Sequence, residues 1–342
     1  QTGIKFSDAH RIEDMSFRGV IDLLILVCFF LGVEDTPAQV MRQGTGSMAG
    51  EQIKYSGFDS WYCREVHESA VIGGKIQKLY EIGNPGFRAD KDNPLLKDTS
   101  SFWSTTNLYA KIGVDKGINC VSPERNEDGY CCRLQSKLEE VNLIGLKLKV
   151  LVAGTLFLGE VIEPVKSLKD PVHNLNHGVP FTGKPKAVQF SYKYRQGGER
   201  IRSVYSSKPV EGLDKAEFCL ILQKRWEDEK GNVYATRIGG TRNFFSETGN
   251  KWVTDTIVDV RYGDITKEPF YDPKLMGLIP QVSELYVKNS RNQMVPLTET
   301  GWDTCDETPT HLVLYFTSSF GGINYTGSPE SVLWVDHVRF IY

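Results

Sequence analysis

Apolar residues at every second position recur along the chain from residue 51 onward. Between positions 188 and 194, Val188, Phe190, Tyr192 and Tyr194 fall on one side of an extended chain, and the intervening residues fall on the other. A period of two residues is typical of a β-strand with one buried face. In the same way, Trp334, Asp336, Val338 and Phe340 would share one face of a last strand.

Further strand-like runs are separated by Gly, Pro, Asn and Asp. The segment RWEDEKGNVYATR predicts a hairpin that turns through Lys230, Gly231 and Asn232. Only residues 135–146 have a pattern that could be helical. The other predicted strands are 75–83, 145–165, 217–226, 232–240, 252–263, 311–320 and 331–342.

Many short strands without intervening helices indicate an all-β protein. Parallel sheets need long crossover connections, usually helices, and the chain shows no such rhythm. We therefore predict an antiparallel two-sheet β-sandwich over residues 51–342, with jelly-roll topology of the galactose-binding-like kind.

The two ends of the predicted sandwich carry similar signals. The segment SGFDSW (56–61) contains Asp59 beside Trp61, and VLWVDHVRFIY (332–342) contains Asp336 beside Trp334. The first and last strands of a jelly roll can lie close together. The segments resemble the first and last strands of galactose-binding-like carbohydrate modules, where such acids often hold a structural calcium ion. The resemblance implies a calcium site at Asp59 and Asp336; alternatively, both acids bond backbone amides at strand ends.

The first fifty residues form a separate segment in this interpretation. An apolar run, Val20–Val33, is interrupted only by Asp22, follows Arg18 and precedes small residues, as in a secretory signal. We expect an exported protein, periplasmic or at the cell surface. The alternative is that the run forms a buried helix or strand of the fold, and the sequence leaves open whether residues 1–50 are cleaved.

Composition narrows the classes of ligand. The net charge of -3 offers no basic face for nucleic acid. The seven cysteines include no CxxC pair and the six histidines are scattered, which disfavours a zinc site. Aromatic residues make up 11% of the chain. They suit either the core of a β-rich protein or flat apolar surfaces for sugar rings.

A family resemblance extends over residues 51–342. The segments FDSWYCREVHESAVIGGKIQKLYEIG, FWSTTNLYAK, LVAGTLFLGEVIEP, GVPFTGKPKAVQFSYKY, LQKRWEDEKGNVYA, YGDITK and FTSSFGGINYTGSPESVLWVDHV resemble the putative carbohydrate metabolism domain family. This family is typical of Bacteroidetes, and its solved members carry the label putative glycoside hydrolase. The resemblance implies a jelly roll with a carbohydrate pocket.

Three segments supply candidate sugar-binding residues. FWSTTN contains Trp103, whose indole could cover a sugar ring, and Asn107, whose amide could bond hydroxyl groups. Lys184 lies in a loop fixed by prolines. Gln223 and Arg225 share a strand face and could form a hydrogen-bonding floor. Each segment also has a structural interpretation. Trp103 could cover the edge of the sandwich, the loop with Lys184 could be a structural turn, and Gln223 and Arg225 could form a solvated row.

The chain contains no clear catalytic motif. Glycosidases need two carboxylates about 5–9.5 Å apart, and sandwich hydrolases often place such a pair on one strand as E-x-D-x-x-E, which is missing here. Glu227 is a weak catalytic candidate because it runs into the predicted hairpin turn. The long Ser-, Thr- and Gly-rich segment 317–331 predicts a loop that could be functional.

We therefore expect an exported carbohydrate-binding protein that takes part in glycan metabolism, with an oligo- or polysaccharide as partner. One alternative is a glycoside hydrolase whose carboxylates are brought together by the fold. A second is a structural or adhesion component of a cell-surface complex, alongside other glycan-utilisation proteins.

Overall fold

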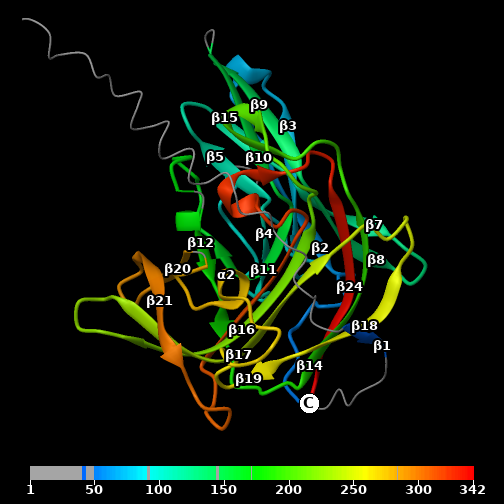
Figure 1. Ribbon diagram of the computed structural model, residues 1–342. Coiled ribbons are helices and arrows are strands. Elements are labelled where there is room, and N and C mark those ends of the chain that lie inside the picture. The colour runs from blue at the N-terminus through cyan, green and yellow to red at the C-terminus, as the bar shows by residue number, and fades with distance from the viewer. Residues whose placement is uncertain (1–40, 44–49, 91–92, 144–145, 171, 283) are drawn as a thin grey trace, which may run out of the picture. The chain divides into compact units, whose positions relative to one another are not determined.

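The computed structural model describes residues 41–43, 50–90, 93–143, 146–170, 172–282 and 284–342 (Figure 1). The described strands belong to one compact unit, Ala38–Tyr342. The predicted signal-like run Val20–Val33 lies outside the described residues. Among the described residues, no helix is long and apolar enough to span a membrane.

The predicted all-β class is confirmed, with several sheets packed together. The first sheet has six strands, in the spatial order β1 (Met41–Gln43), β18 (Val253–Asp259), β14 (Ala187–Arg195), β24 (Val332–Ile341), β8 (Tyr130–Gln135) and β7 (Val121–Arg125).

The second sheet has ten strands. Its order is β13 (Val179–Pro180), β22 (His311–Thr317), β16 (Ala216–Glu227), β17 (Val233–Phe245), β21 (Met294–Trp302), β20 (Leu285–Lys288), β12 (Leu175–His177), β11 (Thr155–Val161) and β4 (Trp103–Thr105), with β19 (Arg261–Tyr262) beside β17. Because β22 also pairs with β11, the sheet closes back on itself.

Smaller elements complete the described structure. A four-stranded sheet has the order β23 (Thr326–Gly327), β15 (Ile201–Pro209), β10 (Leu146–Val152) and β9 (Lys137–Leu143). Two hairpins are β2 (Trp61–His67) with β3 (Ile76–Ile82), and β5 (Leu108–Lys111) with β6 (Asp115–Ile118). Short helices are Ala70–Ile72, Val172–Asn174, α2 (Pro273–Met276) and Gly322–Asn324.

The main core lies between the six-stranded sheet and strands β22, β16 and β17. Val188, Phe190, Tyr192 and Tyr194 of β14 all face it, as the alternation predicts. On β16, Phe218, Leu220 and Leu222 face this core, while Cys219 and Ile221 face a second core. Burial on both faces explains why β16 is a continuous apolar run rather than an alternating one.

Three details differ from the sequence predictions. Residues 135–146 contain strand β9 and the start of β10 rather than a helix, since they pair as a hairpin. β17 pairs with β21, and β12 with β20, in parallel, whereas the other described strand pairs are antiparallel. The jelly-roll topology itself stays a prediction.

The third difference concerns the faces of β24. Val335 and Val338 both face the main core, so Trp334 and Val338 do not share a side. The pairing of β14 with β24 shifts register between Gln189 and Ser191, and His337 has φ of 53°. One extra residue in a strand reverses the alternation beyond it.

The closeness of the first and last segments is confirmed. The Val338 amide donates to the Ser56 carbonyl at 3.0 Å, and the Phe340 amide donates to Gln52 Oε1 at 2.8 Å. The predicted hairpin is also confirmed: Glu227 pairs with Val233, and Gly231 has φ of 90°. The six cysteines among the described residues are all free.

Candidate functional site

Two concave regions of the molecule differ in chemistry. The first, which we call the aromatic pocket, has a volume of about 570 Å³ and lies on hairpin β2–β3. The second, which we call the aliphatic cavity, has a volume of about 950 Å³ and lies beside the four-stranded sheet. Ligand sites in proteins usually span about 300–1,000 Å³, so both have a suitable size.

Strands β2 and β3 form the floor of the aromatic pocket. Trp61, Cys63 and Glu65 line it from β2, and Tyr80 and Lys78 line it from β3, where they pair directly with Cys63 and Glu65. The intervening residues of β2 are buried on the opposite face. The period of two therefore places one aromatic ring from each strand on the outward face of the hairpin.

The walls add two more rings. Phe87 and Tyr130 line the pocket from the loop after β3 and from the start of β8. Phe87 packs edge-on against buried Tyr62, with ring centroids 4.9 Å apart, whereas Tyr130 is 39% exposed. Four aromatic side chains thus surround a space that polar groups also reach.

The Trp61 ring is held in place before any ligand arrives. Its indole Nε1 donates to the Phe58 carbonyl, and the side chain packs against the main core. Because the polar edge is already bonded, the part of the ring that faces the pocket is apolar. A fixed ring loses little conformational entropy when a ligand stacks on it.

Asp59 joins the floor to the Tyr130 wall. Its Oδ1 accepts a hydrogen bond from the Tyr130 amide at 2.9 Å. Gly129 has φ of 150°, and a Cβ atom there would lie 2.1 Å from Asp59 Oδ1. Only glycine therefore permits this approach.

The five predicted sugar-binding residues do not gather in one pocket, so the predicted convergence is wrong. None of them lines either concave region described above. Trp103 is 4% exposed, packs edge-on against Phe58 and donates through Nε1 to Ser56 Oγ at 3.2 Å. It fills the core directly behind the SGFDSW segment, because an indole with a bonded nitrogen is well suited to burial.

Asn107 is fully buried and links two strands. Its Nδ2 donates to the carbonyls of Tyr80 and Val121, both at 2.7 Å. Its Oδ1 accepts from the amides of Cys120 and Val121, both at 2.8 Å. Asn107 thus fixes the backbone of Tyr80, and acts as a support for the pocket floor.

The other predicted sugar-binding residues lie elsewhere. Lys184 Nζ donates to the Cys305 carbonyl at 2.5 Å. Gln223 and Arg225 do adjoin, since Arg225 Nε donates to Gln223 Oε1 at 2.8 Å. Gln223 Nε2 donates in turn to Glu299, which also pairs with Arg237. Burial lowers the pKa of Arg225 to about 9. This row is a buried polar network, and its role in sugar binding stays a prediction.

Asp336 and Asp59 lie close enough to interact. Burial raises the pKa of Asp336, and the Asp59 carboxylate adds to the effect. Both Asp336 oxygens accept hydrogen bonds, from Asn126 Nδ2 and the His337 amide. Calcium requires six or more oxygen ligands, and no group of three or more His, Cys, Asp or Glu among the described residues is placed to hold a metal. These bonds account for both carboxylates without a cation, and the calcium site stays a prediction.

Glu227, the weak catalytic candidate, supports a turn. Its carboxylate accepts from the amide and the hydroxyl of Ser290, both at 2.8 Å, and these bonds lower its pKa. An ionised, doubly bonded carboxylate is poorly suited to donate a proton as a general acid. A catalytic role for Glu227 stays a prediction.

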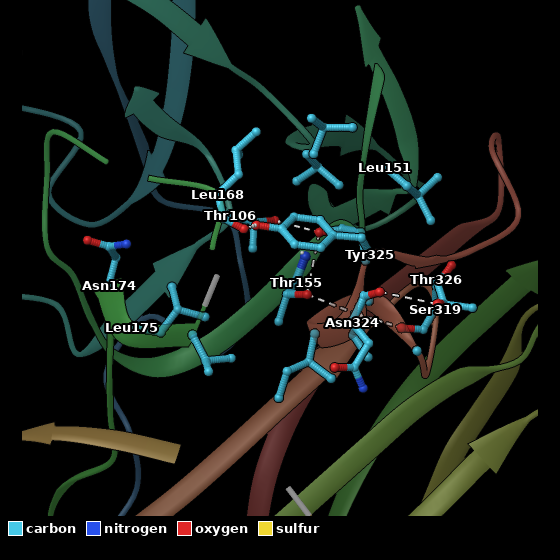
Figure 2. Close-up of a pocket in the computed structure, with 18 of the residues that line it drawn as sticks. Thr106, Leu151, Thr155, Leu168, Asn174, Leu175, Ser319, Asn324, Tyr325 and Thr326 are labelled. Atoms are coloured by element: carbon cyan, nitrogen blue, oxygen red, sulfur yellow. Dashed lines mark hydrogen bonds between the residues drawn. The ribbon is translucent and has the colours of Figure 1, made fainter. Parts of the chain in front are cut away.

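The aliphatic cavity has a polar side formed by the segment 317–331. Figure 2 shows Tyr325 at its centre, and the Tyr325 hydroxyl donates to the Leu168 carbonyl at 2.8 Å. Thr155 Oγ1 donates to Thr317 Oγ1 at 2.9 Å. Ser319, Asn324 and Thr326 line the same side. The predicted functional loop is thus a wall of the cavity.

The charged and titratable groups at the cavity include a buried ion pair and a buried histidine. Glu217 Oε1 accepts from Arg242 Nε at 2.7 Å and from the Tyr315 hydroxyl at 2.6 Å. His177 is 6% exposed, and burial lowers its pKa to about 4, so it is neutral at pH 7. Its Nδ1 has no hydrogen-bond partner among the described residues.

Sequence reasoning singled out Asp59 and Trp61 but missed Tyr80, Phe87, Tyr130, Glu65 and Lys78. One signal was present in the sequence. Side chains alternate between the two faces of β2, so Trp61 and Glu65 lie on the face opposite to that of buried Arg64. The partner strand and the walls come from pairing that the sequence does not reveal.

The chain is similar to a family and to two solved structures. A family model described as a putative carbohydrate metabolism domain matches residues 57–258. No curated protein matches the chain. A solved structure described as a putative glycoside hydrolase from Bacteroides thetaiotaomicron VPI-5482 is 18% identical, with a TM-score of 0.42, over 65% of this chain and 57% of that one.

A second solved structure, described as a putative glycoside hydrolase from Bacteroides vulgatus ATCC 8482, is 14% identical, with a TM-score of 0.40. The likeness covers 65% of this chain and 77% of that one. The chain thus spans little more than half of the first of these two similar proteins.

Proposed function

Because the chain belongs to the putative carbohydrate metabolism domain family, we propose that it binds an oligo- or polysaccharide in the aromatic pocket. A glycan-related role follows from the family. The observation that carries the finer proposal is the set of four aromatic side chains, Trp61, Tyr80, Phe87 and Tyr130, around one space.

A pyranose ring has apolar C–H faces and a rim of hydroxyl groups. Trp61 and Tyr80 offer flat apolar surfaces for such a face, as aromatic side chains combine large contact area with few rotatable bonds. Glu65 and Lys78, paired across the strands, supply an acceptor and a donor for hydroxyl groups. The pocket therefore combines the two kinds of contact that a sugar needs.

We place the protein outside the cytoplasm in this proposal, as the apolar run Val20–Val33 suggests, with other glycan-utilisation proteins at the cell surface as partners. N-terminal sequencing of material secreted by a native-like host tests export. A mature protein that retains this run would contradict it.

The sugar site is tested by Trp61→Ala and Tyr130→Ala. A glycan array first identifies a binding oligosaccharide, and calorimetry then measures its affinity for each variant. We expect each variant to bind about 5- to 30-fold more weakly, because losing aromatic contact costs about 1–2 kcal/mol. Tyr130 is largely outside the core, so its replacement should leave folding intact.

Trp226→Ala is the matched control. Trp226 is 44% exposed, stacks on Tyr234 and lies outside the pocket. It should bind the oligosaccharide as tightly as the unaltered protein. Equal losses in the Trp226 and Trp61 variants, or full affinity in both pocket variants, would overturn the proposal.

The hydrolase alternative can be tested on the same preparation. Asp59, Glu65 and Asp90 line the pocket, and hydrolysis would need two of these carboxylates at about 5–9.5 Å from each other. If the pocket only binds, as we propose, the oligosaccharide binds without release of reducing ends. Reducing-sugar release that is lost in Glu65→Gln would promote the hydrolase instead.

A further inference from the structure

The aliphatic cavity has the wrong lining for a sugar. Aliphatic side chains from several strands and loops face it, among them Leu108, Val114, Val141, Leu148, Val150 and Val165. These six belong to none of the core clusters of the described residues. They form an apolar surface that contacts neither core, and hydroxyl groups placed against it would lose their hydrogen bonds with water.

Such a surface gains free energy when an apolar ligand covers it. Apolar burial stabilises by roughly 25 cal/mol per Å², and apolar cavities in proteins take up apolar molecules rather than water. The volume of about 950 Å³ is large enough for a long chain.

Two arginines on one side of the cavity form no ion pair among the described residues. Arg200 lies just before β15 and Arg202 lies near its start, and both line the cavity. Arg200 Nη1 donates to the Glu211 carbonyl at 3.0 Å and the guanidinium lies 4.4 Å from the Phe320 ring centre.

No acid within ion-pair distance neutralises either arginine among the described residues. The buried Nε of Arg200 has no hydrogen-bond partner there. Asp214, the acid that influences Arg200, accepts hydrogen bonds through Oδ2 from the Ser319 hydroxyl, the Ser328 amide and the Ser331 hydroxyl. Of the other charges that line the cavity, Lys116 pairs with Glu139 and Arg242 with Glu217. Asp170 accepts a hydrogen bond from the Tyr286 hydroxyl at 2.7 Å, and Lys169 and Glu284 also line the cavity.

We propose that the aliphatic cavity binds a fatty acid, with its hydrocarbon chain along the aliphatic wall and its carboxylate at Arg200 and Arg202. A carboxylate would supply an acceptor for Arg200 Nε, which has none among the described residues, and such charge-assisted bonds are among the stronger ones in proteins. The second site is independent of the sugar site, because the two regions share no lining residue.

The test uses the full chain and an environment-sensitive probe, dansyl-undecanoate, displaced by palmitate or by hexadecanol. We expect saturable fluorescence that palmitate displaces. Arg200→Gln should weaken palmitate about tenfold, as for one charge-assisted hydrogen bond, and leave hexadecanol unchanged. Ile323→Trp, which adds volume at the cavity wall, should weaken both competitors.

Lys208→Gln is the matched control, since Lys208 is an exposed cation on β15 outside the cavity. It should behave as the unaltered protein. The proposal is overturned if no saturable probe signal appears, or if Lys208→Gln and Arg200→Gln act alike. Trp61→Ala should retain probe binding, so a failed sugar proposal would not be mistaken for a failed fatty-acid proposal.

Discussion

The aromatic pocket and the aliphatic cavity show how poorly size alone indicates a ligand. The cavity is the larger, at about 950 Å³ against about 570 Å³. Yet its wall of leucines and valines suits a hydrocarbon, whereas the smaller pocket combines rings with charged groups. The difference teaches that the chemistry of the lining, rather than the volume, assigns the ligand class.

One buried cluster of charged side chains connects the aromatic pocket with the aliphatic cavity. Breaking this cluster should have the largest effect on stability. Arg64 is fully buried, and its Nη2 and Nη1 pair with Glu81 at 2.5 Å and with Glu163 at 3.1 Å. Glu163 also accepts from the Tyr109 amide at 2.6 Å. The cluster thereby ties β2 and β3 to β5, which borders the cavity.

Arg64→Met should lower the free energy of unfolding by as much as about 5 kcal/mol, because it leaves two buried carboxylates without their main partner. Urea unfolding measures the loss. Lys97→Met is the control: Lys97 pairs with Glu163 at 2.9 Å, but its side chain is 20% exposed, so water can replace it. If Arg64→Met is as stable as the unaltered protein, the cluster does not join the two regions.

The next largest effect on stability is expected for Trp103, which lies in the core behind the sugar site. Trp103→Ala should cost about 4 kcal/mol of stability, as expected for a buried tryptophan, because Trp103 is 4% exposed. Any protein that remains folded should bind the oligosaccharide with nearly unchanged affinity. Thermal unfolding and calorimetry on one preparation decide this. A stable variant with weak binding would restore Trp103 to the sugar site.

A smaller effect, the pH dependence of stability, also distinguishes the cavity from the pocket. The folded protein holds His177 neutral down to about pH 4, while an unfolded chain takes up the proton near pH 6.5. The unfolded state therefore binds more protons between these values, and stability falls as pH decreases through that window. The loss from His177 should reach about 3 kcal/mol near pH 4.

His177→Gln should remove that part of the slope. The comparison is the difference between the two unfolding curves from pH 7 to pH 4. Part of the slope should survive in the variant, because burial also lowers the pKa of His311 to about 4. Identical slopes would mean that folding leaves the pKa of His177 unchanged. No histidine lines the aromatic pocket, so the effect belongs to the cavity side.

The sequence predicted the strands better than the site. Alternation alone identified the shared face of Val188, Phe190, Tyr192 and Tyr194 on β14, and a strand was predicted over 217–226, where β16 lies, without its burial on both faces. The helix expected over 135–146 failed because a strand at the edge of a small sheet can carry a helix-like pattern of acids and leucines. Tertiary pairing decides such cases.

The predicted convergence of the five sugar-binding residues was wrong for a related reason, since tertiary packing decides where such side chains lie. Trp103 and Asn107 have side chains that suit both sugars and cores, and only packing distinguishes the two. Both residues support the pocket from behind: Trp103 contacts Ser56 and Phe58, and Asn107 fixes the backbone of Tyr80. Tyr80 enters the pocket from the second strand of hairpin β2–β3, whereas Tyr130 reaches it through a contact with Asp59, 71 residues earlier, which one sequence does not encode locally.

Strand β24 has a consequence for biosynthesis. It lies between β14 and β8 in the middle of the six-stranded sheet (Figure 1), yet every other described strand precedes it along the chain. A ribosome releases β24 after the other described strands, so β14 and β8 each keep one unpaired edge until β24 has been translated. Exposed edges invite pairing with other chains. Shielding by a chaperone during translation would matter most for β14 and β8, the strands that β24 finally separates.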